Sequence, residues 1–278
     1  MDPRKEGEKQ LPFNSLIDVI PIKQKILEIV HKANSSHLGS CLSVVDILTV
    51  IYSEIVDKEA IKSRDENRDV VIMSKGHAAA AYYSVLNKYG FISNEDLENY
   101  LENETKLGGH IHHLENDFVE LSTGSLGHGL PYGIGIALAQ KRLKRSGKTF
   151  VIISDGECDE GTTWESALLA NQFKLNNLIV IIDRNMIQSL DSTESVLALE
   201  PLAEKWSSFN WKVIEINGHS HEELVPVLSD AEGPLCVIAN TIKGNGVSFM
   251  EGKVLWHYRS PSKEEYAAAL REMQRGDN

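Results

Sequence analysis

The stretch VIISDGECDEGTTWESALLANQFKLNNLIVIIDRNMIQ, residues 151–188, decides the fold predicted for this chain. Two short runs rich in valine and isoleucine, 149–153 and 178–182, show no polar alternation, which is typical of strands buried on both faces. A segment of helical length separates the runs, so the two strands are expected to be parallel and joined by a crossover. The pattern indicates an α/β fold with a doubly wound, mostly parallel sheet and helices on both faces.

Each of these two strands is followed by residues that carry oxygen ligands. Asp155 and Gly156 follow the first strand, and Asn185 follows the second. Ligands of open parallel sheets bind beyond the carboxyl ends of the strands, so Asp155 and Asn185 are expected on neighbouring loops. One carboxylate and one amide suit a Mg²⁺ ion that shares its shell with water and phosphate. The sequence thus predicts a diphosphate cofactor held through a metal; the alternative is an ordinary Asp-Gly turn and a loop asparagine.

These residues resemble the thiamine diphosphate fingerprint, in which G-D-G is followed after about thirty residues by N. Here the pattern reads Ser154-Asp155-Gly156 and Asn185. The resemblance implies that the side chains of Asp155 and Asn185 and the backbone carbonyl of Ile187 bind Mg²⁺, or Ca²⁺ or Mn²⁺ in its place. Gly156 would let the backbone come close to the diphosphate, because glycine has no Cβ.

Five further blocks, in order between about residues 31 and 258, resemble the cofactor domain of transketolases, so the resemblance covers most of the chain. The block STGSLGHG at 122–129 is close to the family's S-T-G-S-L-G-Q-G. The other blocks are HLGS at 37–40 with LSVVDIL at 42–48, SKGHA at 74–78, GH at 109–110, and KGNGVSFME at 243–251 with WHY at 256–258. The fold implied is the thiamine diphosphate-binding fold.

The resemblance assigns roles to four loop histidines. His37, His77, His110 and His257 would surround the thiazolium ring and the substrate oxygens, as hydrogen-bond donors and proton shuttles. His77 and His257 would also contact the cofactor itself. From the sequence alone, three of these histidines stand beside glycine or Leu-Gly in loops, which suits ligand contacts better than a place in the core.

Backbone and acidic residues of the same loops also receive roles from the resemblance. Backbone groups of Gly124, Ser125 and Leu126 would anchor the aminopyrimidine, and Glu157 would join the cofactor-binding set. Glu160 matches a family residue that meets the partner's catalytic glutamate across an interface. The alternative for Glu160 is a solvated loop carboxylate.

The remaining histidines are expected to be ordinary. His31, His219 and His221 are predicted to be surface residues, and His128 either touches the cofactor or lies at a subunit contact. The run GHIHH at 109–113 could suggest a metal cluster, but no Cys or His-x-x-Glu-His partner accompanies it, so zinc ranks low.

The chain ends twenty residues after Tyr258, where full transketolases continue with a pyrimidine-binding domain. That domain carries the glutamate that protonates the aminopyrimidine. The resemblance therefore implies the N-terminal subunit of a split transketolase, which works with a second chain and is assembled as two copies of each. The reaction implied is transfer of a two-carbon ketol unit from a ketose, free or phosphorylated, to an aldose, with nucleophilic chemistry supplied by the cofactor.

Three departures from the family pattern keep alternatives open. Ser154 replaces the first glycine of G-D-G, Ser36 stands where glycine is usual before the histidine, and Ile111 stands where proline is usual. A specialised sugar pathway or a non-catalytic homologue remains an alternative.

The motifs STGSLGHG and WHY argue against a 2-oxo acid dehydrogenase subunit or a deoxyxylulose-phosphate synthase. The glycines within 127–133 have the wrong spacing for a Rossmann dehydrogenase.

Composition narrows the class of protein. The net charge of −12 argues against a nucleic-acid surface, which needs a basic patch. Cys41, Cys158 and Cys236 are scattered, without a CxxC pair, so neither a disulfide framework nor a zinc ribbon is expected. No apolar signal core or membrane-spanning run is expected, and a cytoplasmic location follows. The chain is predicted to be one domain, 1–278, with a polar arm at 1–14.

Periodicity predicts the remaining elements. Ser43 is expected to cap its helix, and TTWE at 162–165 to form a capping box. Gly129, Gly133 and Ala137 form a small-residue face, which is expected to pack tightly within the fold and is also, with the 157–161 loop, a candidate for partner contacts. The predicted helices are 15–33, 43–55, 78–89, 94–103, 129–144, 162–174, 222–228 and 263–273, and the further strands are 69–73, 211–216 and 235–241.

Overall fold

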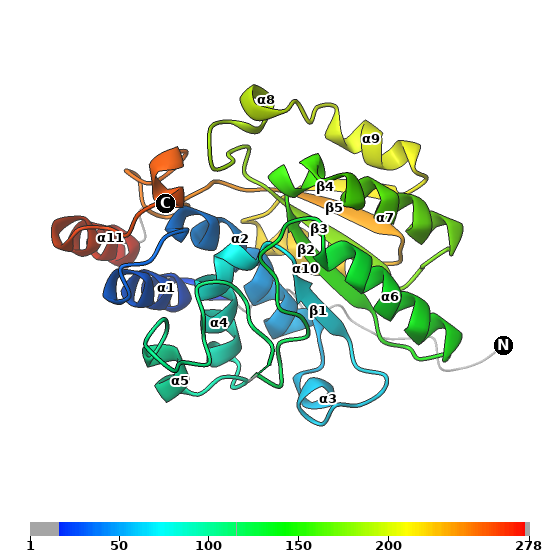
Figure 1. Ribbon diagram of the computed structural model, residues 1–278, viewed down its shortest axis with the longest axis horizontal. Helices are drawn as coiled ribbons and strands as arrows, with labels where there is room; N and C mark the ends of the chain where they lie inside the picture. The colour runs from blue at the N-terminus through cyan, green and yellow to red at the C-terminus, as the bar shows by residue number, and fades with distance from the viewer. Residues whose placement is uncertain (1–16, 115, 276–278) are drawn as a thin grey trace, which may run out of the picture.

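The computed structural model describes residues 17–114 and 116–275, and its centre is a five-stranded parallel sheet (Figure 1). The strand order is β1-β2-β3-β5-β4. The two strands that the sequence singles out are neighbours, in a register that pairs Thr149 with Leu178 and Ser154 with Asp183. This confirms the predicted parallel pair. The strands are β1 (Val70–Met73), β2 (Thr149–Ser154), β3 (Leu178–Arg184), β4 (Lys212–Asn217) and β5 (Leu235–Asn240).

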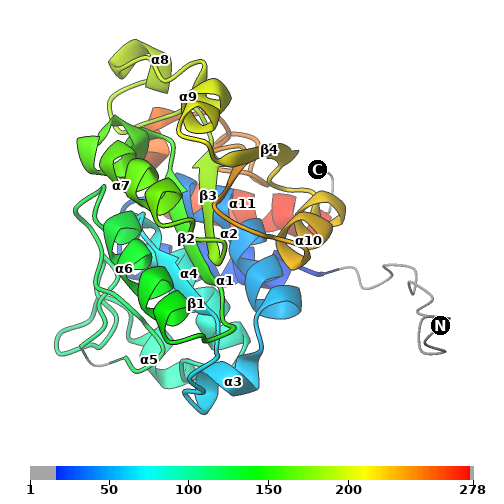
Figure 2. The same cartoon turned by 90° about the vertical axis from the view of Figure 1, so that its right-hand side faces the viewer.

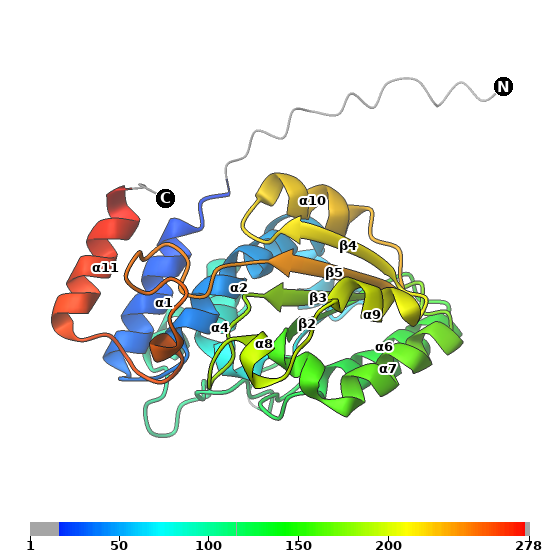
Figure 3. The ribbon, with the colours of Figure 1, turned by 90° about the horizontal axis from the view of Figure 1, so that it is seen from above.

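Helices cover both faces of the sheet, as Figures 2 and 3 show. The first face carries α1 (Ile20–Lys32), α2 (Leu38–Val50), α4 (Ala79–Lys88) and α10 (His221–Ser229). The second face carries α6 (Gly129–Arg142), α7 (Gly161–Gln172) and α9 (Leu202–Ser208). The remaining helices are α3 (Lys58–Lys62), α5 (Asn94–Glu98), α8 (Thr193–Val196) and α11 (Lys263–Arg275), the last of which packs on α1.

Alternation along each strand divides the interior into two cores. Val71 and Met73 of β1 join the core with α1, α2 and α4, whereas Val70 and Ile72 join the core with α6 and α7. Strand side chains have a period of two, so a run with no polar alternation is buried on both sides. The doubly wound α/β fold predicted from the sequence is therefore confirmed.

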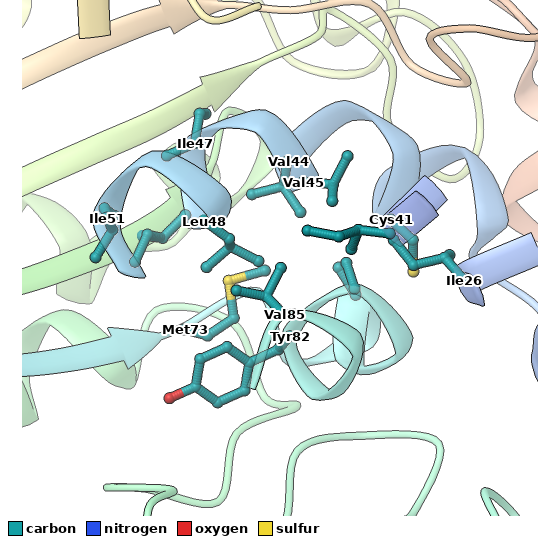
Figure 4. Packing of buried hydrophobic residues seen from close by; sticks show 14 of the residues in the cluster. Ile26, Cys41, Val44, Val45, Ile47, Leu48, Ile51, Met73, Tyr82 and Val85 are labelled. Atoms are coloured by element: carbon teal, nitrogen blue, oxygen red, sulfur yellow. The ribbon is translucent and has the colours of Figure 1, made fainter. Parts of the chain in front are cut away.

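Helix α2 is the centre of the first core (Figure 4). Every residue from Leu38 to Val50 is buried, and the helix continues as a π-helical turn, Ile51–Ile55. By length and composition the 18 residues Leu38–Ile55 could span a membrane, but 83% of this segment is buried inside the fold. The expectation that no apolar run reaches such a length is wrong, because a helix packed on all sides needs the same composition.

The small-residue face of α6 lies against the sheet. A Cβ at Gly133 would come within 2.5 Å of Val151 Cγ2, and a Cβ at Gly129 would overlap Ser74. Ala137 is fully buried in the same core. The predicted tight packing within the fold is confirmed. The expectation that this face meets a partner is wrong, since the sheet already covers it.

Two helix starts differ from their predicted positions because hydroxyl groups serve other contacts. Helix α2 begins at Leu38, and Ser43 does not cap it but donates to Asp183 Oδ2 at 2.6 Å. Helix α7 begins at Gly161 without a side-chain cap. Thr162 instead donates to the carbonyl of Gly127 at 2.8 Å. The capping box and the Ser43 cap are therefore wrong.

Other boundaries shift by a few residues. The helix expected at 94–103 ends at Glu98, and α3, α8 and α9 are not among the predicted helices. The arm predicted at 1–14 and the beginning of the helix predicted at 15–33 lie outside the described residues. All three cysteines are buried and unpaired, in agreement with their scattered spacing.

Candidate active site

A cavity of about 210 Å³ opens beyond the carboxyl ends of β1, β2, β3 and β5. It contains ten of the thirteen predicted site residues and adds others that the sequence reasoning did not select. The predicted residues that line it are His37, His77, His110, Gly124, Leu126, Asp155, Gly156, Asn185, Ile187 and His257. The additional lining residues are Ser40, Lys75, Ser154, Gln188, Ser189 and Lys243.

Asp155 ties the loop after β2 to the loop after β3. Its Oδ1 accepts from the Gly156 amide at 2.8 Å, and its Oδ2 accepts from the Met186 amide at 2.6 Å. Arg184 Nη1 lies 3.3 Å from the same Oδ2. Burial, and after it repulsion from Asp183, raises the pKa of Asp155 above its ordinary value. A cation beside this carboxylate would favour its charged form.

The loop after β3 has a strained conformation. Met186 has φ 64°, in the left-handed region that side chains other than glycine rarely adopt. Asn185 Oδ1 accepts from the amide of Ile187 at 3.1 Å, and the carbonyl of Ile187 accepts from Lys243 Nζ at 3.0 Å. The turn brings Asp155, Asn185 and Ile187 together in the lining of the cavity.

Ser154, which replaces the family glycine, makes local hydrogen bonds. Its Oγ accepts from the Glu157 amide at 3.2 Å, and its own amide donates to Glu157 Oε2 at 3.3 Å. This reciprocal pair closes the turn after β2. The Glu157 carboxylate is fully buried, where it also accepts from Ser74 Oγ and from the Gly127 amide. Glu157 therefore ties three loops together and does not line the cavity.

Four histidines, His37, His77, His110 and His257, also line the cavity. The ring of His37 lies 4.8 Å from that of His257, 5.4 Å from that of His77 and 5.6 Å from that of His110. His37 stands in the left-handed region with φ 70°, and its amide donates to the carbonyl of His257 at 3.1 Å. Segments some 220 residues apart, 37 and 257, therefore meet at this point.

Three of these histidines are held in the neutral form. Burial, followed by the positive charges nearby, lowers the pKa of His37 to about 4 and that of His257 to about 3. The pKa of His77 is also well below its ordinary value, because of burial and then the charge of Lys75. Neutral rings at pH 7 can both donate and accept a hydrogen bond.

Glycines allow the loops to approach one another closely. A Cβ at Gly76 would overlap the backbone of Thr123, whose amide donates to the Ile111 carbonyl at 3.0 Å. A Cβ at Gly124 would lie 3.2 Å from the His110 ring. The histidine loops and the 122–129 loop are thus packed backbone to backbone, and the exposed glycine surface admits a ligand at short range.

Two buried lysines were missed by the sequence reasoning. Lys75 is fully buried and forms an ion pair with Asp183, which also accepts from Ser43 and Thr241. Lys243 Nζ donates to the carbonyls of Ile187 and Gln188 at 3.0 and 3.2 Å and lies 3.2 Å from His257 Nδ1. Burial, then repulsion from Lys75, lowers the pKa of Lys243 to about 8.

A sequence signal for these lysines exists in retrospect. Lys75 and Lys243 each precede a glycine within a few residues of a strand's carboxyl end, where a lysine has little reason to be unless it faces an anion. Their partners, however, come from strands that are distant in the sequence, so pairing could not be read from local pattern.

Three predicted residues lie outside the cavity wall. Glu157 is buried behind it, Ser125 is exposed beside it, and Glu160 is exposed at the start of α7. Their predicted roles in ligand or partner contacts remain predictions. His128 is exposed, with its Nδ1 3.0 Å from the Leu126 carbonyl. His31 stacks on Tyr266 at 4.5 Å between ring centroids.

Comparisons with known proteins agree with this geometry. The family model described as "Transketolase, thiamine diphosphate binding domain" matches residues 16–274. The chain is 40% identical to one of the subunits of the apulose-4-phosphate transketolase of Phocaeicola vulgatus, over 90% of each chain. It is 33% identical to the 6-deoxy-6-sulfo-D-fructose transketolase subunit SqwG of Clostridium sp., over 97% of this chain and 98% of the relative.

Solved structures share the fold. The transketolase of Campylobacter jejuni superposes with a TM-score of 0.84 at 28% identity, covering 93% of this chain and 42% of that one. The chain thus spans less than half the length of this solved transketolase. A family model that matches almost the whole described chain, together with relatives of 30% identity and above, shows the family. The chain belongs to the transketolase family, of which it forms the thiamine diphosphate-binding domain.

Proposed function

We propose that this chain is the cofactor-binding subunit of a two-chain transketolase that transfers a two-carbon ketol unit from a ketose to an aldose. The observation that supports this most directly is the meeting, in one cavity, of the oxygen ligands Asp155, Asn185 and Ile187 with three histidines held neutral. Relatives that match this chain over nine-tenths of their length are named as transketolase subunits, which supports a second chain.

The cavity fits Mg²⁺ and a diphosphate. A carboxylate, an amide oxygen and a backbone carbonyl are hard ligands, and they leave room for water and phosphate oxygens in an octahedral shell. Within the described residues no cluster of three His, Cys, Asp or Glu side chains could hold a metal alone, and we propose a metal site that is shared with the diphosphate. Lys243 and Lys75 supply positive charge, and Gly124 and Gly156 allow close approach.

Thiamine diphosphate, when bound, would supply a nucleophilic carbon for chemistry at a ketose carbonyl. The chain's own residues then have distinct tasks. Asp155, Asn185 and Ile187 hold the metal, and Lys243 faces the diphosphate. His37, His77 and His257, because they are neutral, can accept from a sugar hydroxyl and donate to an oxygen that gains negative charge.

A vestibule of about 300 Å³ adjoins the histidines and suggests how the sugar is recognised. It shares His37 and His110 with the cavity, and its lining residues, as described, include no lysine or arginine. Its other lining residues are Asn34, Ser35, Ser36, Tyr100, Leu101, Gly109 and Tyr258. This chain therefore offers neutral groups to sugar hydroxyls.

The relatives are named for a phosphorylated and a sulfonated sugar, and we extend that substrate class to this chain as a proposal. Because the described lining of the vestibule includes no lysine or arginine, we propose that the cation that recognises a phosphate or sulfo group comes from the partner chain. We further propose two copies of each chain in the working particle. The three buried, unpaired cysteines suit a reducing cytoplasm.

The test is reconstitution. This chain is purified and assayed for ketol transfer alone, and with a second chain that carries the pyrimidine-binding half, in the presence of thiamine diphosphate and Mg²⁺. Turnover is expected only with both chains, and Asp155→Ala in this chain should abolish it. Robust turnover by this chain alone, free of host transketolase, would overturn the two-chain proposal. Thiamine diphosphate binding without turnover in any pairing would favour the non-catalytic homologue.

A further inference from the structure

A second cluster of charged residues lies where α2 meets the loops that follow β4 and β5. Asp46 is 5% exposed and accepts from His219 Nδ1 at 2.9 Å and from His221 Nε2 at 3.0 Å. Lys23 Nζ lies 3.3 Å from the same carboxylate. Burial alone would raise the pKa of Asp46, but the bonds from both histidines and the charge of Lys23 hold it below its ordinary value.

This cluster corrects the expectation for two histidines. His219 and His221 are only 15% and 18% exposed and are bonded to a carboxylate on another helix, so they are not ordinary surface residues. A separate cavity of about 370 Å³ lies against them. Its walls share no residue with the candidate active site, as far as both are described.

His219 differs from His221 in one bond. The backbone amide of Ile242 donates to His219 Nε2 at 2.9 Å. A ring nitrogen that accepts a hydrogen bond carries no proton, so the proton of the neutral ring lies on Nδ1, where it is donated to Asp46. His219 therefore bridges the side chain of Asp46 in α2 and the backbone that follows β5. In the described part of the chain, His221 contacts Asp46 but makes no such bond to that backbone.

The backbone that His219 holds carries Lys243. On one side of this lysine, Ile242 is bound to His219; on the other, Asn245 Oδ1 accepts from Lys23 Nζ at 2.5 Å. The amide of Gly244 donates to the carbonyl of Gly39 in the first turn of α2 at 3.0 Å. The backbone on both sides of Lys243 is thus hydrogen-bonded to other segments, including α1 and α2. The side chain of Lys243 itself reaches the cavity.

We propose that His219 is a positioning residue, which fixes the segment 241–246 against Asp46 and so sets the Nζ of Lys243 where a diphosphate binds. The ligand class is an inorganic or organic diphosphate with Mg²⁺, and this inference rests on the proposed function of the cavity. Lys243 must meet its ligand at the end of a flexible four-carbon side chain, so a backbone held from outside the cavity lowers the entropy lost on binding.

His221 provides a matched control. It is the same residue type, two positions away, with nearly the same exposure and the same carboxylate partner at nearly the same distance. Substitution of either histidine removes one hydrogen bond from Asp46. Only substitution of His219 also releases the Ile242 amide. Glutamine at 219 offers both an N–H donor and an acceptor oxygen, so His219→Gln is the conservative variant.

The first experiment measures binding of inorganic pyrophosphate with Mg²⁺ to the full chain by calorimetry. His219→Leu is expected to weaken binding about tenfold, the effect of one well-placed hydrogen bond. His219→Gln should recover most of the wild-type affinity, and His221→Leu should leave it within about twofold. Equal weakening by His219→Leu and His221→Leu would overturn the proposal, because the hydrogen bond that each variant removes from Asp46 would then explain both.

The second experiment does not need the ligand. Hydrogen exchange of the amides in 241–246 should accelerate in His219→Leu and stay as in wild type in His221→Leu. In the wild type, nitrogen NMR should show the ring of His219 with its proton on Nδ1. A proton on Nε2, or unchanged exchange in His219→Leu, would overturn the positioning role. If wild type binds neither pyrophosphate nor thiamine diphosphate, the proposed function fails, and the exchange data still decide whether His219 fastens the segment.

Discussion

Two groups of histidines, one at the start of α2 and one bound to Asp46 within the same helix, differ in the partner that each has. At the start of α2, His37, His77 and His257 meet one another beside lysines, and within the described residues no carboxylate is bonded to them, so burial keeps them neutral and free to bind. Farther along α2, His219 and His221 are bound to Asp46. The comparison teaches that the partner decides whether a buried histidine is available to a ligand or serves to brace the fold.

We call Asp46, His219 and His221 the bracing group, and the residues that line the candidate active site the binding group. The largest effect is expected at the bracing group. Asp46→Ala removes the acceptor of three groups and leaves the charge of Lys23 buried, which should lower the free energy of unfolding by about 3–5 kcal/mol. Chemical denaturation of the ligand-free chain measures it. Asp117→Ala is the control, because Asp117 pairs with Arg64 on the surface, with 84% of its side chain exposed, and should cost less than about 1 kcal/mol. Similar losses in both variants would contradict a bracing role.

The next effect separates the binding group from the bracing group. In wild type, thiamine diphosphate and Mg²⁺ together should stabilise the fold by about 3 kcal/mol at a hundredfold excess over the dissociation constant. Asp155→Ala should lose this ligand-dependent gain, because the cation loses its carboxylate. Asp46→Asn should lower the ligand-free stability and keep most of the gain. Thermal shifts with each ligand alone and with both measure it; an unchanged gain in Asp155→Ala would show that the metal site is elsewhere.

A smaller effect is expected on the number of protons that the chain takes up when it unfolds. The pKa of His257 is about 3 in the folded chain and about 6.5 when unfolded, so between these values the unfolded state binds more protons. The contribution of this neutral ring to stability is therefore present above pH 6.5 and falls as the pH is lowered towards 3. Near pH 5, His257→Asn should reduce the proton uptake on unfolding by about one. Potentiometric titration of both chains measures this difference, and equal uptake would mean that His257 is not held neutral.

Much of the fold and of the cavity could be predicted because the deciding signals are local. Buried strands show as unbroken apolar runs, and parallel strands deliver the residues after them to one edge. These two rules are enough to put Asp155 and Asn185 on adjacent loops. The resemblance to transketolases adds the histidine loops, which no periodicity would have joined.

What could not be predicted depends on contacts between distant segments. The ion pair of Lys75 and Asp183 joins residues 108 positions apart, and the bond of His219 to Asp46 spans 173 positions. Neither leaves a pattern in the neighbouring sequence. The predicted caps are wrong for the same reason. Ser43 and Thr162 have the residue type of caps, but their hydroxyls donate to Asp183 in β3 and to the Gly127 carbonyl, both distant in the sequence.

The smallest effect is expected at Ser154, whose hydroxyl either supports the turn after β2 or contacts the ligand directly. Ser154 lines the cavity, yet its hydroxyl accepts from the Glu157 amide at 3.2 Å. Ser154→Gly removes that bond but leaves the backbone able to close the turn as the family's glycine does. Binding of thiamine diphosphate with Mg²⁺, measured by calorimetry, should weaken by less than about tenfold, roughly 1.4 kcal/mol. Because the serine also fills space, Ser154→Ala separates the hydroxyl from the volume. A loss beyond tenfold in both variants would show that the Ser154 hydroxyl is a direct ligand of the cofactor or the metal.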